Sequence, residues 1–186
     1  ASGAKRLAGV LLVQQEDGTW IPSKQHKLDE DYMNEDTDAL FFDADGDGDQ
    51  DLYIVSGGSE FVAGAPLYQD RIYINDGSGQ FTKSATALPT ETSSGSCVAA
   101  ADFDKDGDLD YATCVHQDSI YWFENTGKNE WPRHSVGKIL TTQLGSAITD
   151  VDGDGWEDLI VGGTWYRNPQ NPRNANFTNI VYDSRI

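Results

Sequence analysis

The sequence has few basic residues, only two cysteines and no long apolar run. Its 13 lysines and arginines stand against 31 aspartates and glutamates, so the formal net charge is −18. Nucleic acids and anionic membrane surfaces would both be repelled by such a chain. No apolar run approaches the roughly 18–20 residues of a membrane-spanning helix, and the run near the start is too short for the core of a secretory signal. We expect no nucleic-acid partner, no membrane insertion, and either an intracellular protein or a mature exported one.

The cysteines and histidines give no sign of catalysis. Cys97 and Cys114 lie on what would be neighbouring strands, so a cross-strand disulfide is one reading. Both lie in apolar runs, where cysteine often serves as a small hydrophobic residue, and we favour free thiols. His26, His116 and His134 are scattered, without the spacing of a metal site. The sequence also lacks a nucleophile elbow and a phosphate-binding loop, so it offers no candidate catalytic residue.

The negative charge is concentrated in three short segments with one pattern. DADGDGDQD (43–51), DFDKDGDLD (102–110) and DVDGDGWED (150–158) all read D-x-D-x-D-G-x-x-D and precede a strand-like run. Carboxylates this close repel one another, so a cation is expected among them. A single Asp/Gly run can be a plain solvated turn. Three copies with the same Asp and Gly positions indicate a shared function instead.

Each element of the pattern suits calcium. Carboxylates at positions one, three, five and nine would converge on one ion, and the glycine at position six permits the turn that brings in the carbonyl of position seven. We expect about three calcium ions, one per loop. The candidate metal ligands are Asp43, Asp45, Asp47, Asp49, Asp51, Asp102, Asp104, Asp106, Asp108, Asp110, Asp150, Asp152, Asp154, Trp156 and Asp158.

The EF-hand is the obvious rival for such a loop. It shares the first six positions but requires a bidentate glutamate at position twelve and a helix on either side. Position twelve is Ile54, Thr113 or Val161 in the three copies. The aspartate at position nine therefore takes the place of the missing glutamate, and the loops are not EF-hands.

The segments around the loops predict short strands, because they are rich in Val, Ile, Tyr and Trp and are separated by Gly and Asn turns. The expected strands are 7–14, 18–23, 37–42, 51–56, 71–75, 80–84, 96–101, 110–115, 119–124, 131–136, 145–150, 158–162, 164–168 and 177–182. The loops start at 43, 102 and 150. The separations of 59 and 48 residues are close to the repeat length of a four-stranded propeller blade. We therefore predict an all-β fold of about 3.5 four-stranded β-propeller blades. In this single domain of residues 1–186, segment 1–36 would be the outer hairpin of a blade and a linker, and 37–95, 96–144 and 145–186 would be blades.

This arrangement resembles the FG-GAP and VCBS repeats, the family that includes the propeller of integrin alpha subunits. The resemblance rests on FFDADGDGDQDLYIVSGG, AADFDKDGDLDYATC and ITDVDGDGWEDLIVGG and spans roughly residues 37–168. It implies a calcium ion in each loop, on the outer rim of the propeller. The Gly-Ala-Pro signature of the family does not follow the loop strands, where this chain has SGG, CVH and VGG. The resemblance therefore gives little support for integrin-type ligand binding.

A half-blade leaves a propeller incomplete. Closed propellers use about 4 to 8 blades, and an open fan would expose apolar blade faces. Either the chain is a piece of a longer protein, or two copies associate to complete a ring. We expect a homodimer or a fragment of a larger propeller.

Two functions from different classes fit these observations. The first is a calcium-binding module for binding or adhesion, with a protein or carbohydrate ligand, in a secreted, extracellular or periplasmic setting where millimolar calcium suits exposed sites. The second is the propeller scaffold of a carbohydrate-active enzyme such as a lyase or dehydratase. Trp122, Trp131, Trp156, Trp165 and Tyr166 could stack on sugar rings, although aromatic residues in such strands more often fill the space between blades.

Overall fold

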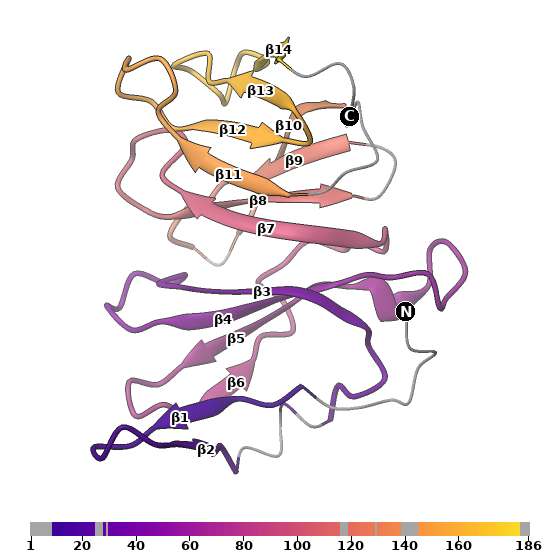
Figure 1. The fold of residues 1–186 in the computed structure, drawn as a ribbon, viewed down its shortest axis with the longest axis vertical. Helices are drawn as coiled ribbons and strands as arrows, with labels where there is room; N and C mark the ends of the chain where they lie inside the picture. The colour runs from indigo at the N-terminus through magenta and orange to yellow at the C-terminus, as the bar shows by residue number, and fades with distance from the viewer. Residues whose placement is uncertain are drawn as a thin grey trace.

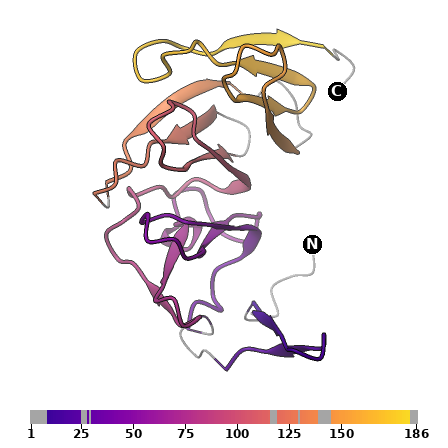
Figure 2. The same cartoon turned by 90° about the vertical axis from the view of Figure 1, so that its left-hand side faces the viewer.

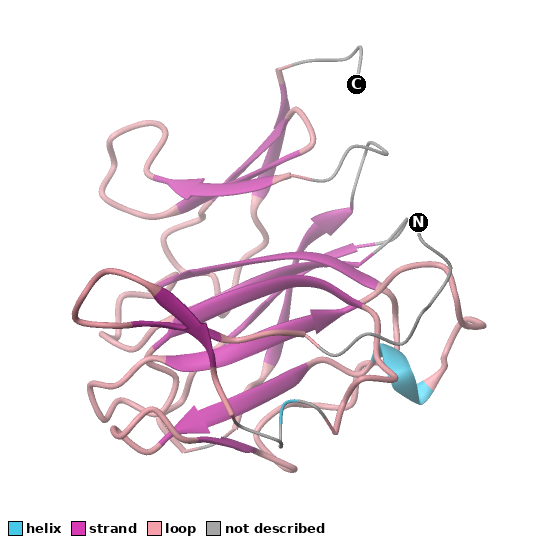
Figure 3. Ribbon diagram, turned by 60° about the horizontal axis from the view of Figure 1, so that its bottom comes forward, coloured by secondary structure: helices cyan, strands magenta, loops and turns pink. Residues whose placement is uncertain are grey.

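The structure, a computed structural model, describes residues 9–24, 28, 30–115, 119–128, 130–138 and 145–182. Strands dominate this part of the chain (Figure 3), with one 3-10 turn, η1 (Pro66–Tyr68). The strands are β1 (Leu12–Gln14), β2 (Trp20–Pro22), β3 (Asp36–Phe42), β4 (Asp51–Ser56), β5 (Arg71–Asn75), β6 (Phe81–Lys83), β7 (Gly95–Ala101), β8 (Asp110–Val115), β9 (Ser119–Phe123), β10 (Arg133–Lys138), β11 (Ser146–Thr149), β12 (Asp158–Val161), β13 (Thr164–Arg167) and β14 (Thr178–Val181). The expected all-β fold is confirmed.

The strands form three four-stranded antiparallel sheets and one hairpin. Each strand of the sheets β3–β6, β7–β10 and β11–β14 pairs with its neighbour in sequence, and β1 pairs with β2. Such sheets are the blades of a β-propeller, and we name them the first, second and third blade. The hairpin and the blades follow one another along an arc that does not close (Figures 1 and 2). The prediction of about 3.5 blades is therefore confirmed.

The hydrophobic cores lie between neighbouring blades. Successive side chains of a strand point to opposite faces, so each blade can pack one face on the preceding unit and the other on the next. Between the first and second blades, Phe42, Tyr53, Val55 and Ile72 pack with Val98, Tyr111, Phe123 and Trp131. Between the second and third blades, Phe103, Ile120, Trp122 and Val136 pack with Leu159, Val161, Tyr166 and Phe177.

The two ends of the arc expose apolar side chains. The hairpin covers part of the first blade, where Leu52, Tyr73 and Phe81 are buried with Leu11 and Leu28 against them. Its own apolar side chains are open to solvent, with Trp20 59% exposed. At the other end, Val151 of the third blade is 42% exposed, whereas the equivalent Ala44 and Phe103 are 5% and 0% exposed. The difference arises because the arc has a blade after the first and the second but none after the third.

Most strands lie within one residue of their expected bounds, but β1, β2 and β10 do not, and β2 begins at Trp20 instead of residue 18. β1 begins at Leu12 instead of residue 7, and residues 1–8 lie outside the described part. It pairs only with the three residues of β2, which limits its length. β10 begins at Arg133 instead of Trp131, because Pro132 has no N–H to donate to a ladder and uses its carbonyl to accept the N–H of Glu124 at 3.0 Å.

The cysteines lie directly opposite each other on β7 and β8. Both Cys97 and Cys114 are buried free thiols, in agreement with the reading that we favoured. A hydrogen bond between the two thiols lowers the pKa of Cys97 and raises the pKa of Cys114, which burial raises further. The pair therefore forms part of the core between the second and third blades.

Candidate metal centres

The aspartate at position nine anchors each acidic loop. Asp51, Asp110 and Asp158 are the first residues of β4, β8 and β12, and all three are 0% exposed. One carboxylate oxygen of each accepts the N–H of position two of its loop, at 2.9, 3.0 and 3.1 Å. The other accepts the N–H of the asparagine that ends or follows the third strand of the blade, at 2.7, 2.8 and 2.7 Å. The same four hydrogen-bonding groups thus close every loop.

The first aspartate and the sixth-position glycine shape the turn. Gly48, Gly107 and Gly155 have φ angles of 95°, 102° and 85°, which residues with a Cβ rarely adopt. Their N–H groups donate to the carboxylate of position one at 3.0, 3.1 and 2.8 Å. The fifth-position aspartate accepts the N–H of position seven in each loop. These bonds fold the loop around its own acidic side chains.

Positions one, three and nine converge in all three copies. The groups Asp43–Asp45–Asp51, Asp102–Asp104–Asp110 and Asp150–Asp152–Asp158 each offer three carboxylate oxygens within 4.8 Å of one another, close enough to hold a metal ion. The fifth-position Asp106 enters a second such group, with Asp104 and Glu124. The fifth-position Asp47 and Asp154 and the seventh-position residues stand outside these close groups among the described residues. The carboxylates of Asp49 and Asp108 lie beside Gly77 and Gly127, in the turn between the third and fourth strands.

The electrostatics of the loops call for positive charge. Burial raises the pKa of Asp51 and of Asp45, and the neighbouring carboxylates raise both further. In the second loop burial raises the pKa of Asp110 to about 8, with repulsion from Asp104 and Asp106 added to it. Asp51 and Asp110 are thus buried beside other carboxylates, at a free-energy cost that a bound cation would remove. An all-oxygen donor set in a tight turn is the kind that calcium prefers, so the residues present fit this ion.

Two arginines already lie against the acidic loops. Nη2 of Arg173 is 2.7 Å from Asp104 and 2.6 Å from Asp106, and its Nε is 2.9 Å from Glu124. Nε of Arg167 is 2.6 Å from Asp152. In the first loop, the described part of the chain shows no such pair between an aspartate and a lysine or arginine. A guanidinium thus neutralises part of the acidic charge at positions three and five of the second and third loops.

Three asparagines bond the loops through their side chains, two of them across a blade boundary, and the sequence reasoning missed them. Nδ2 of Asn125 donates to the carbonyl of Ala44 in the first loop at 3.0 Å. Nδ2 of Asn168 donates to the carbonyl of Phe103 in the second loop at 3.0 Å. Asn75 has the same place in the first blade, and its Nδ2 donates to Gln50 of its own blade at 3.1 Å. The only signal for them was an asparagine at the same distance before a turn in each repeat.

The aromatic residues considered for sugar stacking are largely structural. Trp122, Trp131 and Tyr166 are 0%, 5% and 0% exposed and pack between the blades. Trp156 is half-buried, with the ammonium of Lys105 at 4.7 Å from its ring centroid. Trp165 is also half-buried. Filling of the space between blades accounts for the first three, and Trp20 on the hairpin is the tryptophan with the most open ring.

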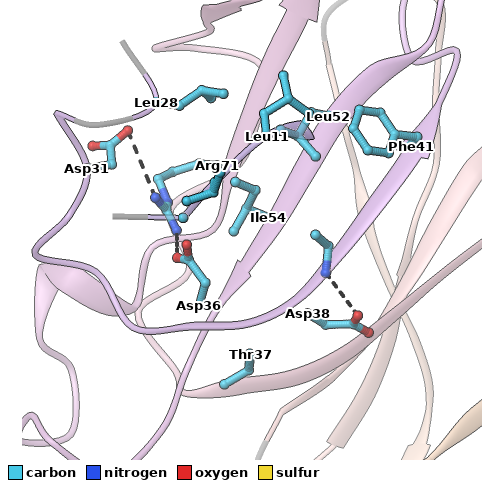
Figure 4. A pocket seen from close by; sticks show the side chains of 13 residues that line it. Leu11, Leu28, Asp31, Asp36, Thr37, Asp38, Phe41, Leu52, Ile54 and Arg71 are labelled. Atoms are coloured by element: carbon cyan, nitrogen blue, oxygen red, sulfur yellow. Dashed lines mark hydrogen bonds and ion pairs between the residues drawn. The ribbon is translucent and has the colours of Figure 1, made fainter. Parts of the chain in front are cut away.

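A cavity of about 370 Å3 lies between the first blade and the segments that precede and follow the hairpin (Figure 4). Leu11, Leu28, Phe41, Leu52 and Ile54 provide apolar walls, and Arg71 lies at the rim. Arg71 is 3% exposed and pairs with Asp36, while Asp31 lies 4.0 Å away. The cavity therefore offers mainly apolar surface to an occupant, beside this group of charged side chains.

Of the three histidines considered in the sequence analysis, His134 is the one in the described part of the chain. Its Nε2 lies 2.9 Å from a carboxylate oxygen of Glu124, and its ring stacks on Trp122 with centroids 4.4 Å apart. His26 and His116 lie outside the described residues. His134 therefore packs at a blade edge beside the second loop.

Comparison with known proteins gives one match to a repeat and one likeness of fold. Residues 56–113, which include the second acidic loop, match the FG-GAP-like repeat. No curated protein matches the sequence. A solved structure of a lectin from Agrocybe aegerita, described for its specific recognition of non-reducing terminal N-acetylglucosamine, superposes with a TM-score of 0.52 at 17% identity. The match covers 78% of this chain and 38% of the lectin, so the chain spans well under half of that structure. The described part of the chain contains no helix that could span a membrane.

Proposed function

Because the chain contains an FG-GAP-like repeat and folds as an open stack of propeller blades, we propose that it is a calcium-binding propeller module. The observation that carries this proposal is the threefold repetition of one cage. In each copy the carboxylates of positions one, three and nine lie within 4.8 Å of one another, on the same set of backbone hydrogen bonds. Asp43, Asp45 and Asp51 would hold the first ion, and the equivalent aspartates would hold the others.

Calcium suits these loops better than magnesium. Magnesium demands a small octahedral shell and keeps several of its waters, whereas calcium accepts six to eight oxygens in flexible geometry. The loops offer many carboxylates on a short turn, which fits the larger shell. An ion that binds only the folded loop stabilises the fold by about 2.7 kcal/mol per site at a hundredfold excess over its dissociation constant. Three filled loops would thus supply much of the roughly 5–15 kcal/mol that a domain typically has.

The test is thermal unfolding of the whole chain with calcium, with magnesium and with a chelator at constant ionic strength. We expect the melting temperature to rise with calcium concentration and to respond little to magnesium. Asp43→Asn should remove one bound ion in calorimetric titration. Asp76→Asn is the matched control, because Asp76 is an exposed turn aspartate that accepts bonds from Ser78, outside the loops. Equal melting temperatures in all three solutions would show that the loops are solvated turns.

We further propose that the calcium-loaded module binds a carbohydrate or protein ligand outside the cell. The likeness of its fold to a lectin structure supports carbohydrate as the first ligand class to test. An extracellular setting is supported because exposed calcium sites of low affinity are filled only where calcium is millimolar. A glycan array that includes terminal N-acetylglucosamine, read with calcium and with chelator, tests this ligand class. Binding without turnover supports the module. Cleavage or elimination of a polysaccharide by the chain alone would instead establish the enzyme scaffold.

Self-association is the proposed way of covering the ends of the arc. Leu12, Trp20 and Ile21 on the hairpin are 49%, 59% and 48% exposed, and Val151 and Ile180 on the third blade are 42% and 38% exposed. Two copies could each place the third blade against the hairpin of the other, so that two equivalent contacts cover both patches of each copy and close a ring.

Light scattering across micromolar concentrations tests this contact. We expect a dimer that Trp20→Ala weakens. Val62→Ala is the control, because Val62 is 80% exposed in the loop between β4 and η1, away from both patches. A folded monomer at all concentrations would refute the contact.

A further inference from the structure

The three loops differ in the charge that surrounds them, although their backbones are alike. In each blade one asparagine donates its N–H to the ninth-position aspartate. The residue directly before this asparagine is Ile74 in the first blade, Glu124 in the second and Arg167 in the third. The first loop thus has a neutral neighbour, the second an added carboxylate and the third a guanidinium. A fourth group, Arg173, reaches the second loop from the segment between β13 and β14. The three loops therefore have the same backbone geometry but different electrostatic surroundings.

Arg173 acts across the blade boundary. It belongs to the third blade, but its guanidinium contacts Asp104, Asp106 and Glu124 of the second. The side chain of Asp104 is 3% exposed and that of Arg173 is 40% exposed, so water and salt screen this ion pair from the arginine side only. Positions three and five of the second loop are thus engaged by a cation that is covalently part of the chain.

Arg167 acts within its own blade. Its Nε is 2.6 Å from Asp152 and its Nη2 is 3.3 Å from Asp154, which are positions three and five of the third loop. Nε2 of Gln170 and the N–H of Trp156 also donate to Asp154, at 2.8 and 2.9 Å. The same two ligand positions are therefore engaged in both loops, by arginines from different places in the sequence.

We propose that Arg167 and Arg173 are tethered counter-cations that compete with the metal ion, so that the first loop fills before the other two. This inference rests on the proposed calcium function. An ion in the second or third loop must take the third- and fifth-position carboxylates from a guanidinium or tolerate its charge nearby. If the guanidinium leaves the loop for only about 1–10% of the time, the apparent affinity falls by about 10- to 100-fold.

The position of Arg173 adds a link between blades. Arg173 extends from the third blade to the second loop. A metal ion in the second loop would therefore displace Arg173 and release the segment between β13 and β14 that carries it. Linkage is reciprocal, so a change that strengthens the contact of Arg173 with the second loop lowers the affinity of that loop for the ion by the same factor. Arg167 has no such link, because it and its loop belong to one blade.

Calorimetric titration of the full chain with calcium tests the proposal. We expect one tight and two weaker sites in the wild type, and Asp43→Asn should remove the tight one. Arg173→Gln and Arg167→Gln should each raise the affinity of one weak site by about tenfold or more and leave the tight site unchanged. Arg133→Gln is the matched control, because Arg133 is equally exposed and pairs with Glu91 away from the loops. It loses the same charge and should change no site by more than about twofold.

Terbium luminescence assigns the sites. Trp156 is position seven of the third loop, so its indole should sensitise an ion there, and Arg167→Gln should shift that titration while Arg173→Gln does not. Arg173→Lys, which keeps the charge but loses the forked contact, should give an intermediate affinity even if the glutamine variant folds poorly. Three equal sites that respond to neither arginine would overturn the inference and leave the calcium function standing, and so would a loss of affinity in Arg173→Gln. An absence of calcium binding in every variant would instead refute the proposed function itself.

Discussion

Substitution of one interblade asparagine should cost far more than substitution of its counterpart at the end of the stack. Asn168 is 2% exposed, and its Nδ2 donates to the carbonyls of Phe103 and Glu157, both at 3.0 Å. Asn168→Ala leaves these two carbonyls without that donor. A lost hydrogen bond is worth about 1 kcal/mol net, and a buried group left unpaired costs about 1–3 kcal/mol. We expect a loss of about 3–5 kcal/mol in the free energy of unfolding.

Asn75 provides the matched comparison. Its backbone N–H also bonds the ninth-position aspartate, but its Nδ2 makes an exposed bond to Gln50 within one blade. Water replaces that partner in Asn75→Ala, so we expect a loss of about 1 kcal/mol. Both variants keep the backbone bond that closes the metal loop, because alanine retains its N–H.

Urea unfolding followed by tryptophan fluorescence, at fixed calcium, measures both losses. The m-value should stay constant if the variants change stability alone. Losses that agree within about 0.5 kcal/mol would refute the view that the asparagine stabilises the contact between blades.

Two further predictions concern single sites in the first blade. Gly57→Ala should destabilise the fold by about 1–3 kcal/mol, because a Cβ there would lie 1.9 Å from the carbonyl oxygen of Gly95, and thermal unfolding of this variant measures the effect. Burial raises the pKa of Asp70 from its ordinary value of 3.8 to about 6, so folding takes up a proton between these pH values and stability falls as the pH rises from about 3.8 to 6. Above pH 6 the penalty is about 3 kcal/mol, and Asp70→Asn should remove much of this pH dependence in urea unfolding between pH 4.5 and 7.5. A wild-type pH profile that the asparagine variant reproduces would contradict this account.

The blades could be predicted from the sequence because their signals are local and repeated. The acidic motif recurs with the same glycine, and each copy is followed by a strand that begins at the ninth-position aspartate, as Asp51 does for β4. The start of β10 was wrong by two residues because the ladder depends on N–H groups that Pro132 does not have.

The contacts between blades could not be predicted in this way. Asn125 reads as a turn residue, and its bond to Ala44 depends on how two blades pack. Arg173 lies 67 residues after Asp106, with no motif around it, and only the tertiary fold brings their atoms to 2.6 Å. The local sequence pattern thus predicts the acidic loops, whereas the packing of the blades decides which side chains neutralise their charge.

The shared carbonyl of position two has a consequence for how such a chain can change over evolution. The first and second loops are each a candidate metal cage in their own blade and the acceptor for the asparagine of the next, as Phe103 is for Asn168. A duplicated unit therefore brings both a donor and an acceptor with it, and it can be inserted between existing units without a new interface. Gain and loss of whole repeats should be easier than a change within one, because a single altered loop disturbs two neighbours. The number of blades is free to drift, while the spacing inside each loop is not.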